Sequence, residues 1–359
     1  WNTRYFKDTS DIEISYKVLV NGNIESEGKI EDIIAPDSKK TVTINCTESC
    51  KDIFVNFTYL DKINGIEIAT EQVVVSEATI SNSIAEKTAN IKDNGKTIDV
   101  SFKNGSIKFD KKQGLVSWKK NGKELLNTSP FDGDKGFVPH LYRGKLDNDM
   151  FIVMFWKTIG LDTAKAKLVS CKATDKGIIT KYKFISKGFI NLATACVDYK
   201  IDENGKIMIT AKLKKAYPLT DKLPRFGVHA EMIKDLESVE YYGRGPAENY
   251  SDFKEHSPIG RYTETVSEMA HKYIKPQDSG NRGEIRECSI SSVNGEKISI
   301  SAVDKPFNFN ANHFTLEQLK KANHIEDLPD VATTFISVDG FVRGTGSNSC
   351  GPGPAPEHT

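Results

Sequence analysis

The sequence predicts an all-β protein of antiparallel strands, in which a small β-sandwich is followed by a much larger one. Apolar and polar residues alternate in short segments along most of the 359 residues, and this period of two is typical of half-buried strands. Asn-Gly and other glycine-containing turn signals separate these segments at short intervals. Helical segments do not alternate with the strands, which argues against a barrel of eight βα units.

The N-terminal part contains two clear hairpin patterns. Alternating apolar residues run through 12–20, and Asn21-Gly22 follows, a dipeptide that favours a tight hairpin turn. Residues 53–75 repeat the scheme around Asn64-Gly65. About five to seven short strands in a segment of this size are typical of an immunoglobulin-like sandwich. We therefore expect such a domain at residues 1–80.

A polar, weakly patterned segment at residues 77–90 predicts a domain boundary. Beyond it the alternation resumes, so a large antiparallel β-sandwich is expected at residues 88–359. One segment instead has helical spacing, with Leu316 and Leu319 on one face and Thr315 in position to cap the N-terminus. The rest of this domain is expected to be nearly free of helices.

Composition excludes several functional classes. The 49 basic and 49 acidic residues balance, so no basic excess is available for nucleic acid or an anionic membrane. No apolar run reaches the ~20 residues of a membrane-spanning helix. The six cysteines are scattered, unlike a disulfide framework or a zinc site, and we expect free thiols. We expect a cytoplasmic location, in a bacterium given the many Lys, Asn and Ile residues.

One polar loop, RGKLDND, places two acidic residues around Asn148. It is compatible with a solvated turn whose side chains cap the backbone. It is also compatible with a domain interface or a sugar site, because carboxylates and amides form hydrogen bonds with hydroxyl groups. The candidate interface residues in this loop are Arg143, Asp147, Asn148 and Asp149.

A second loop begins in YYGRGPAENY, residues 241–250. Two glycines and a proline suit neither a helix nor a fully paired strand, so the chain turns sharply there. We expect this loop mainly to position other loops and a neighbouring domain, with an ion pair between Arg244 and Glu248. Direct contact with sugar is the less favoured interpretation. The candidate residues are Tyr242, Arg244, Glu248, Asn249 and Tyr250.

Four sequence blocks carry a family resemblance. They are YYGRGPAENYSDFKEHSPIGRY, YIKPQDSGNRGEIREC, FNFNANHFTLEQLKKANH and ISVDGFVRGTGSNSCGP. In this order, the blocks are similar to the signature blocks of the C-terminal β-sandwich of β-galactosidases in glycoside hydrolase family 2. Residues 102–126 and LDND at 146–149 resemble the start of that domain, and residues 2–44 resemble the immunoglobulin-like domain that precedes it.

The resemblance implies a fold and a role. The large domain is expected to be a supersandwich like that of galactose mutarotase. The parent protein would be a retaining β-galactosidase acting on terminal β-D-galactosides such as lactose. In that family the catalytic glutamates lie in an upstream barrel, and the acid/base glutamate follows an Asn. This chain contains no Asn-Glu dipeptide, so we expect no catalytic residue here and a C-terminal portion that is inactive alone.

The same resemblance implies partners. The chain would complete the mouth of the active site, contact the catalytic barrel of the parent and contribute to a homo-oligomer. It would meet galactoside only through the full-length enzyme, and neither nucleic acid nor a membrane is an expected partner. The family uses Mg²⁺ and Na⁺, whose main ligands lie elsewhere in the parent, so we expect no metal ligand in this chain.

The last glycine-rich loop is the expected substrate-proximal segment. Taken alone, it is compatible with a simple exit from the final strand. In the resembling family this loop reaches over the barrel, and some members present a Trp to the sugar. Here the matching residue is Cys350, which offers no stacking face and implies an altered preference for the leaving group. The substrate-proximal candidates are Arg343, Ser347, Asn348, Ser349 and Cys350.

Two alternative functions remain open from the sequence. The chain is also compatible with a carbohydrate-binding module that uses tyrosine faces. The second alternative is an aldose epimerase on the same sandwich, which would need a histidine and a carboxylate as acid and base. The pair to test would be His140 or His229 with Glu284 or Glu287.

Overall fold

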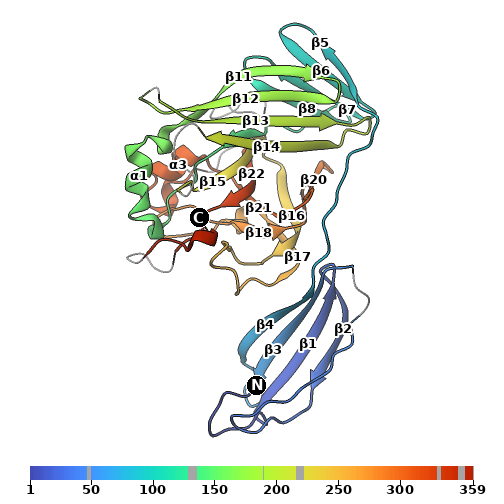
Figure 1. Cartoon of the computed structure of the whole chain (residues 1–359), viewed down its shortest axis with the longest axis vertical. Helices are drawn as coiled ribbons and strands as arrows, with labels where there is room; N and C mark the ends of the chain where they lie inside the picture. Colours follow the sequence, from blue (N-terminus) through green and yellow to red (C-terminus); the bar gives the residue numbers. More distant parts are fainter. Residues whose placement is uncertain are drawn as a thin grey trace.

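The computed structural model describes residues 1–46, 50–127, 136–188, 190–215, 222–329, 333–346 and 352–358. It consists of antiparallel sheets, which confirms the all-β class. A small sheet lies at one end of the molecule and a much larger body of sheets at the other (Figure 1). Between them the chain runs without strands from Ser76, the end of β4, to Asn90, the start of β5. The sequence places the domain boundary in this segment.

The small domain contains one sheet of four strands in the order β2-β1-β3-β4 within the described residues. The sequence predicts about five to seven short strands in this domain, which is more than the four in the described residues. Its Asn21-Gly22 turn joins β1 to β2, and both residues have positive φ, 49° and 78°, as a tight hairpin turn requires. The strands are β1 (Ile12–Val20), β2 (Asn23–Ile30), β3 (Ile53–Asp61) and β4 (Glu67–Ser76).

The large domain contains four sheets in the described residues. Two of them lie at the far end from the small domain (Figure 1). One has the order β5-β6-β7-β8-β9, with β5 (Asn90–Asp93), β6 (Thr97–Phe102), β7 (Gly105–Asp110), β8 (Gly114–Lys120) and β9 (Lys123–Glu124). The other has the order β11-β12-β13-β14, with β11 (Lys165–Thr174), β12 (Gly177–Ile185), β13 (Asn191–Ile201) and β14 (Ile207–Lys215).

The other two sheets lie between that pair and the small domain. One, with the order β17-β16-β19-β20, contains β16 (Leu236–Arg244), β17 (Ile259–Thr265), β19 (Glu287–Ser292) and β20 (Lys297–Ser301). The second has the order β10-β15-β22-β21-β18 and is called the pocket sheet below. Its strands are β10 (Val138–His140), β15 (Arg225–Ile233), β18 (Arg282–Ile285), β21 (Phe307–Asn312) and β22 (Thr333–Val342).

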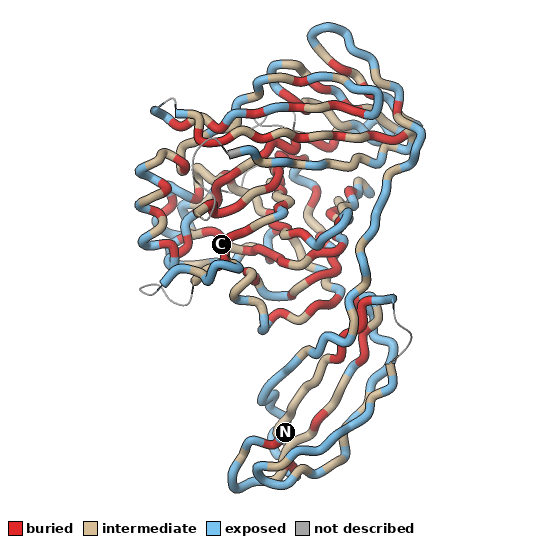
Figure 2. Tube along the Cα trace, viewed as in Figure 1, coloured by how far each residue is buried: buried red, intermediate tan, exposed pale blue. Residues whose placement is uncertain are grey.

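All four sheets of the large domain contribute to one hydrophobic core. Buried side chains from each sheet, such as Ile98, Tyr199, Met232 and Ile290, belong to a single cluster. Buried residues are concentrated between these sheets, whereas the small domain is mostly exposed or intermediate (Figure 2). A single core shared by several sheets is typical of one domain.

Three short helices accompany the sheets. The helix α3 (Leu316–Lys321) is the predicted one, and the Thr315 hydroxyl accepts a hydrogen bond from the Gln318 amide as its N-cap. The helix α1 (Ile152–Thr158) was not predicted, because its apolar sequence, IVMFWKT, lacks a capping side chain. The third is α2 (Val266–Met269). None of the helices in the described part of the chain is long and apolar enough to cross a membrane.

The remaining short elements are four 3₁₀ turns, η1 (Asp147–Asp149), η2 (Leu161–Thr163), η3 (Ile325–Asp327) and η4 (Pro356–His358). The five cysteines among the described residues are free thiols, as expected. Cys350 lies outside those residues.

Candidate functional site

One face of the pocket sheet is polar. Along β15, Val228, Ala230 and Met232 point into the main core, whereas His229 and Glu231 line a pocket on the opposite face. The same alternation holds on β21 and β22, because successive side chains of a strand point to opposite faces. On β21 the pocket residues are Asn310 and Asn312, and on β22 they include Phe335 and Ser337.

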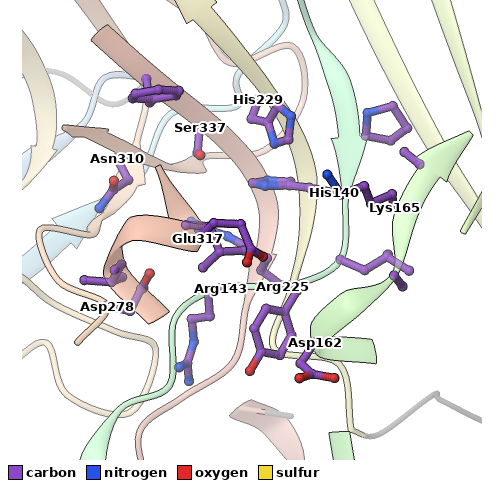
Figure 3. A pocket seen from close by; sticks show the side chains of 18 of the residues that line it. His140, Arg143, Asp162, Lys165, Arg225, His229, Asp278, Asn310, Glu317 and Ser337 are labelled. Atoms are coloured by element: carbon purple, nitrogen blue, oxygen red, sulfur yellow. The ribbon is translucent and has the colours of Figure 1, made fainter. Parts of the chain in front are cut away.

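The pocket has a volume of about 180 Å³. Its floor is the polar face of the pocket sheet, and its walls come from residues 139–143, from 162–166 and from α3. Lys320 on α3 donates a hydrogen bond to the Asp162 carbonyl at 2.8 Å, which ties two of the walls together. His140 and His229 lie toward one end and Asp278 and Arg143 toward the other (Figure 3).

A chain of polar contacts sits at the histidine end. His140 Nε2 is 2.5 Å from Asp339 Oδ1, and Arg225 donates to Asp339 Oδ2 at 2.7 Å. Burial lowers the pKa of His140 to about 4, against the opposing attraction of Asp339. The imidazole is therefore neutral at pH 7. Since a carboxylate only accepts hydrogen bonds, Nε2 carries the proton and Nδ1 is an acceptor.

At the other end, Arg143 forms a two-pronged ion pair with Asp149, at 2.6 Å and 3.1 Å. Both side chains are buried. Burial alone would lower the pKa of Arg143, but the adjacent Asp149 carboxylate more than offsets this and raises it. Asp278 is buried beside this pair, and its burial raises the pKa of its carboxyl group against the attraction of Arg225 and Arg143.

The loop RGKLDND is therefore only partly a solvated turn. Asp147 and Asn148 are exposed, and the Asp147 amide donates to the Gln277 side chain at 2.8 Å. Asp149 faces inward and also accepts a hydrogen bond from the Leu146 amide at 2.7 Å. The buried Asp149 side chain therefore holds this loop in place.

The predicted ion pair between Arg244 and Glu248 is wrong. Arg244 pairs with Glu284, at 3.0 Å between Nε and Oε1. Glu248 instead accepts hydrogen bonds from the Tyr273 hydroxyl and from the Gly280 amide at 2.8 Å. The two side chains separate because Arg244 ends β16, whereas Glu248 faces the loop at residues 273–281.

Two other candidates from residues 241–250, Asn249 and Tyr250, contact neighbouring segments. Asn249 is buried; its side chain accepts from the Gly283 amide at 2.9 Å and donates to the carbonyls of Arg244 and Ala247. Tyr250 packs in a small buried cluster with Leu146 and Val342. These contacts join three segments that are far apart in the sequence.

Tyr242 reaches the small domain. Its hydroxyl donates to Asp52 Oδ2 at 2.6 Å, and its ring packs with Leu19 and Phe54 in a buried cluster. Residues 241–250 therefore include a residue that contacts the small domain.

The last glycine-rich loop begins beside the segment that follows residues 241–250. Asp252 accepts hydrogen bonds from the backbone amides of Thr345 and Gly346, each at 2.8 Å. Arg343 is buried at the end of β22, and its amide donates to the Pro224 carbonyl at 2.9 Å. The other substrate-proximal candidates, which are Ser347, Asn348, Ser349 and Cys350, lie outside the described residues.

The histidine and glutamate pair that an epimerase would need is not assembled from the predicted residues. Both His140 and His229 line the pocket, but Glu284 and Glu287 do not. Glu284 is paired with Arg244 and Lys254, and Glu287 with Arg261. The pocket contains Glu231 instead.

Sequence reasoning missed the pocket. Its signal is present in the strand segments RFGVHAEMI and FNFNAN, where polar residues able to form hydrogen bonds occupy every second position. From the sequence alone, alternation of this kind indicates only half-buried strands. A polar sheet face becomes a pocket only when loops and a helix fold over it. The strand pattern alone does not show which face is covered in this way.

Within the described residues, no group of three or more His, Cys, Asp or Glu side chains is placed to hold a metal ion. The described residues therefore do not fit a Mg²⁺ site built from such ligands, and no step below depends on a metal.

Comparisons with known proteins agree with this architecture. A family model described as "Beta galactosidase small chain" matches residues 101–359. A second, "Beta-galactosidase, domain 4", matches residues 1–76. The solved structure described as "Crystal Structure Analysis of HI1317" reaches a TM-score of only 0.33 at 11% identity, covering 73% of this chain and 91% of that one. Nothing about this chain is inferred from it.

Curated relatives extend over nearly the whole chain. The β-galactosidase of Actinobacillus pleuropneumoniae is 26% identical over 372 aligned positions, which cover 97% of this chain and 35% of that protein. The β-galactosidase of Streptococcus thermophilus is 26% identical over 361 positions, covering 97% of this chain and 34% of that protein. The chain spans about a third of the length of these relatives. Because the family model of the β-galactosidase small chain matches residues 101–359, the chain belongs to that family.

Proposed function

We propose that this chain is the non-catalytic portion of a retaining β-galactosidase that hydrolyses terminal β-D-galactosides. In this proposal it shapes the mouth of the active site and contacts the catalytic barrel. The two carboxylates that break the glycosidic bond are supplied by polypeptide outside this chain. The names of the relatives and the share of their length that the chain spans support this division.

One observation carries the proposal, namely the convergence of three loops on one side of the large domain. Asp252, from the loop after β16, holds the start of the last glycine-rich loop through two backbone amides. Tyr250 from the same loop packs against Leu146 of the LDND loop and Val342 of β22. Loops anchored to a rigid sandwich in this way are the usual means of building a binding surface.

The proposal extends to ions, assembly and location. Any Mg²⁺ or Na⁺ of the parent enzyme is held by residues outside this chain. The parent is a bacterial cytoplasmic enzyme, and this portion contributes to its oligomer contacts. Each of these statements rests on family membership.

The test begins with the chain alone and an aryl β-galactoside. We expect no turnover above that of a mock purification. Turnover that persists at constant specific activity through several purification steps would contradict the proposal.

The second arm uses a polypeptide that joins this chain to the barrel of a β-galactosidase. There, Asp252→Ala releases the last loop and is expected to raise KM several-fold with a smaller change in kcat, because the loop contributes to substrate binding. Asp235→Ala, at an exposed acid near Asn294, is the matched control. Equal KM values for the two variants would argue against the mouth role.

A further inference from the structure

The pocket on the polar face of the pocket sheet combines hydrogen-bond donors and acceptors. Asn310 and Asn312 offer amides, Ser337 offers a hydroxyl, and the neutral His140 offers an acceptor at Nδ1. They come from three strands of the pocket sheet, and Asn310 and Ser337 are direct cross-strand neighbours on its polar face. Closely spaced donors and acceptors of this kind match a molecule that carries several hydroxyl groups.

The charges around the pocket nearly cancel. Three cationic side chains (Arg143, Lys165 and Arg225) and four acidic ones (Asp162, Glu231, Asp278 and Glu317) line it, a formal sum of three minus four, or −1. Two of the cations are already held by acids, Arg143 by Asp149 and Arg225 by Asp339. No excess of positive charge is therefore available to hold a phosphate or a carboxylate.

Three buried polar atoms of pocket-lining residues lack partners within the described residues, and one of them is Nε of Arg143. The other two are Oδ2 of Asp278 and Nε of Arg225. Asp278 is only 8% exposed and Arg225 only 6%. An unpaired polar atom at such a depth is unfavourable, because it has lost its contacts with water and gained no partner. A molecule with several hydroxyl groups can supply a partner for each atom, because a hydroxyl donates to a carboxylate and accepts from a guanidinium.

Apolar groups supply the rest of the wall. Phe184, Phe314 and Phe335 line the pocket together with Leu316. A sugar ring has both hydroxyl groups and an apolar face of C–H groups, and it needs surfaces of both kinds. The volume of about 180 Å³ is below the roughly 300–1,000 Å³ of pockets for drug-sized ligands, which limits the occupant to a small molecule.

We propose that this pocket is a binding site for one neutral, polyhydroxylated molecule of monosaccharide size. The occupant lies over Asn310 and Ser337, between the histidine end and the Asp278 end. This site belongs wholly to the large domain of this chain, so the proposal stands apart from the proposed role in β-galactoside hydrolysis.

The test is titration of the whole chain with D-galactose and D-glucose, followed by ligand-detected NMR and calorimetry. We expect saturable binding of at least one of them, with a dissociation constant on the order of 1 mM. Galacturonate, the same ring with a carboxylate, is expected to bind at least about tenfold more weakly, since the formal charges of the pocket lining sum to −1. Equal or tighter binding of galacturonate would overturn the assignment of a neutral ligand.

Ser337 provides the variant that places the ligand. It is half-buried on β22, and Ser337→Leu fills the pocket, so binding is expected to weaken at least about tenfold. Ser337→Ala removes only one hydroxyl and is expected to cost a few-fold. Ser170→Leu, at a half-buried serine of β11 that does not line the pocket, is the matched control and should bind normally.

Two results would overturn the proposal. One is the absence of saturable binding of any neutral sugar by a chain that unfolds cooperatively. The other is binding that Ser337→Leu leaves unchanged while that variant retains the wild-type Tm. Faster interconversion of galactose anomers that is lost in Ser337→Leu would support the site. Turnover of β-galactosides is a separate readout, so failure of one proposal is distinguishable from failure of the other.

Discussion

Arg286 of the large domain donates a hydrogen bond from Nε to Asp52 Oδ2 of the small domain, at 2.9 Å. Both side chains are less than a tenth exposed. The Tyr242 hydroxyl donates to the same oxygen at 2.6 Å, while Asp52 Oδ1 accepts from the Ala78 amide of the linker at 2.7 Å. One carboxylate therefore joins the small domain, the linker and the large domain.

Asp52→Ala is expected to destabilise this junction by about 3–5 kcal/mol, because it leaves the Arg286 charge and the Tyr242 hydroxyl buried without their partner. Urea unfolding followed by tryptophan fluorescence and circular dichroism measures the effect, and we expect the transition to broaden or split as the domains uncouple. Asp32→Ala removes an exposed ion pair with Lys40 and is expected to cost no more than about 1 kcal/mol. Equal midpoints for the two variants would contradict the role of Asp52.

The two Asn-Gly hairpins of the small domain provide a matched comparison. Gly22 and Gly65 both have positive φ, 78° and 70°, so Ala at either position is strained by roughly 1–2 kcal/mol. A Cβ on Gly22 would also lie 2.7 Å from the Tyr242 ring, whereas one on Gly65 meets nothing within 4 Å.

Gly22→Ala is therefore expected to lower Tm more than Gly65→Ala, and the difference reports the contact between the domains. Differential scanning calorimetry measures both variants in the same buffer. A larger loss for Gly65→Ala would show that the Gly22 turn does not press on the large domain.

Features that depend on local patterns are predictable from this sequence. The Asn21-Gly22 turn and the Thr315 cap need only a few consecutive residues, and both are present. Tyr242 contacts Asp52 of the small domain, which is in line with the expectation that a long polar loop rich in aromatic residues packs on a neighbour.

Long-range partners are not predictable in the same way. Arg244 pairs with Glu284, 40 positions away, rather than with Glu248 in its own turn, because the register of β16 and the path of the next loop decide which acid is near. The pocket is hidden for a related reason. His140, Asn310 and Ser337 are separate in the sequence, and only the order of strands in the pocket sheet brings them together.

The start of the last glycine-rich loop is expected to depend on Asp252. In Asp252→Ala, the amides of Thr345 and Gly346 lose their acceptor, so their hydrogen exchange should accelerate at least about tenfold while the core strands remain protected. Exchange measured by mass spectrometry on the whole chain checks this. Asp235→Ala is the control, and unchanged protection at residues 345 and 346 in Asp252→Ala would contradict the anchoring.

The buried histidine gives the stability a specific pH dependence. Burial lowers the pKa of His140 from 6.5 to about 4, even though Asp339 opposes this shift, while Arg225 and His229 reinforce it. Between these two pH values the unfolded chain binds a proton at His140 that the folded chain does not, so the free energy of unfolding falls as pH is lowered from about 6.5 to about 4. The contribution is on the order of 3 kcal/mol over that window.

Urea unfolding at a series of pH values measures the slope in three proteins. His140→Gln should show a shallower fall than wild type, whereas His324→Gln, at an exposed histidine, should keep the wild-type slope. Identical slopes for wild type and His140→Gln would mean that His140 titrates normally in the folded chain.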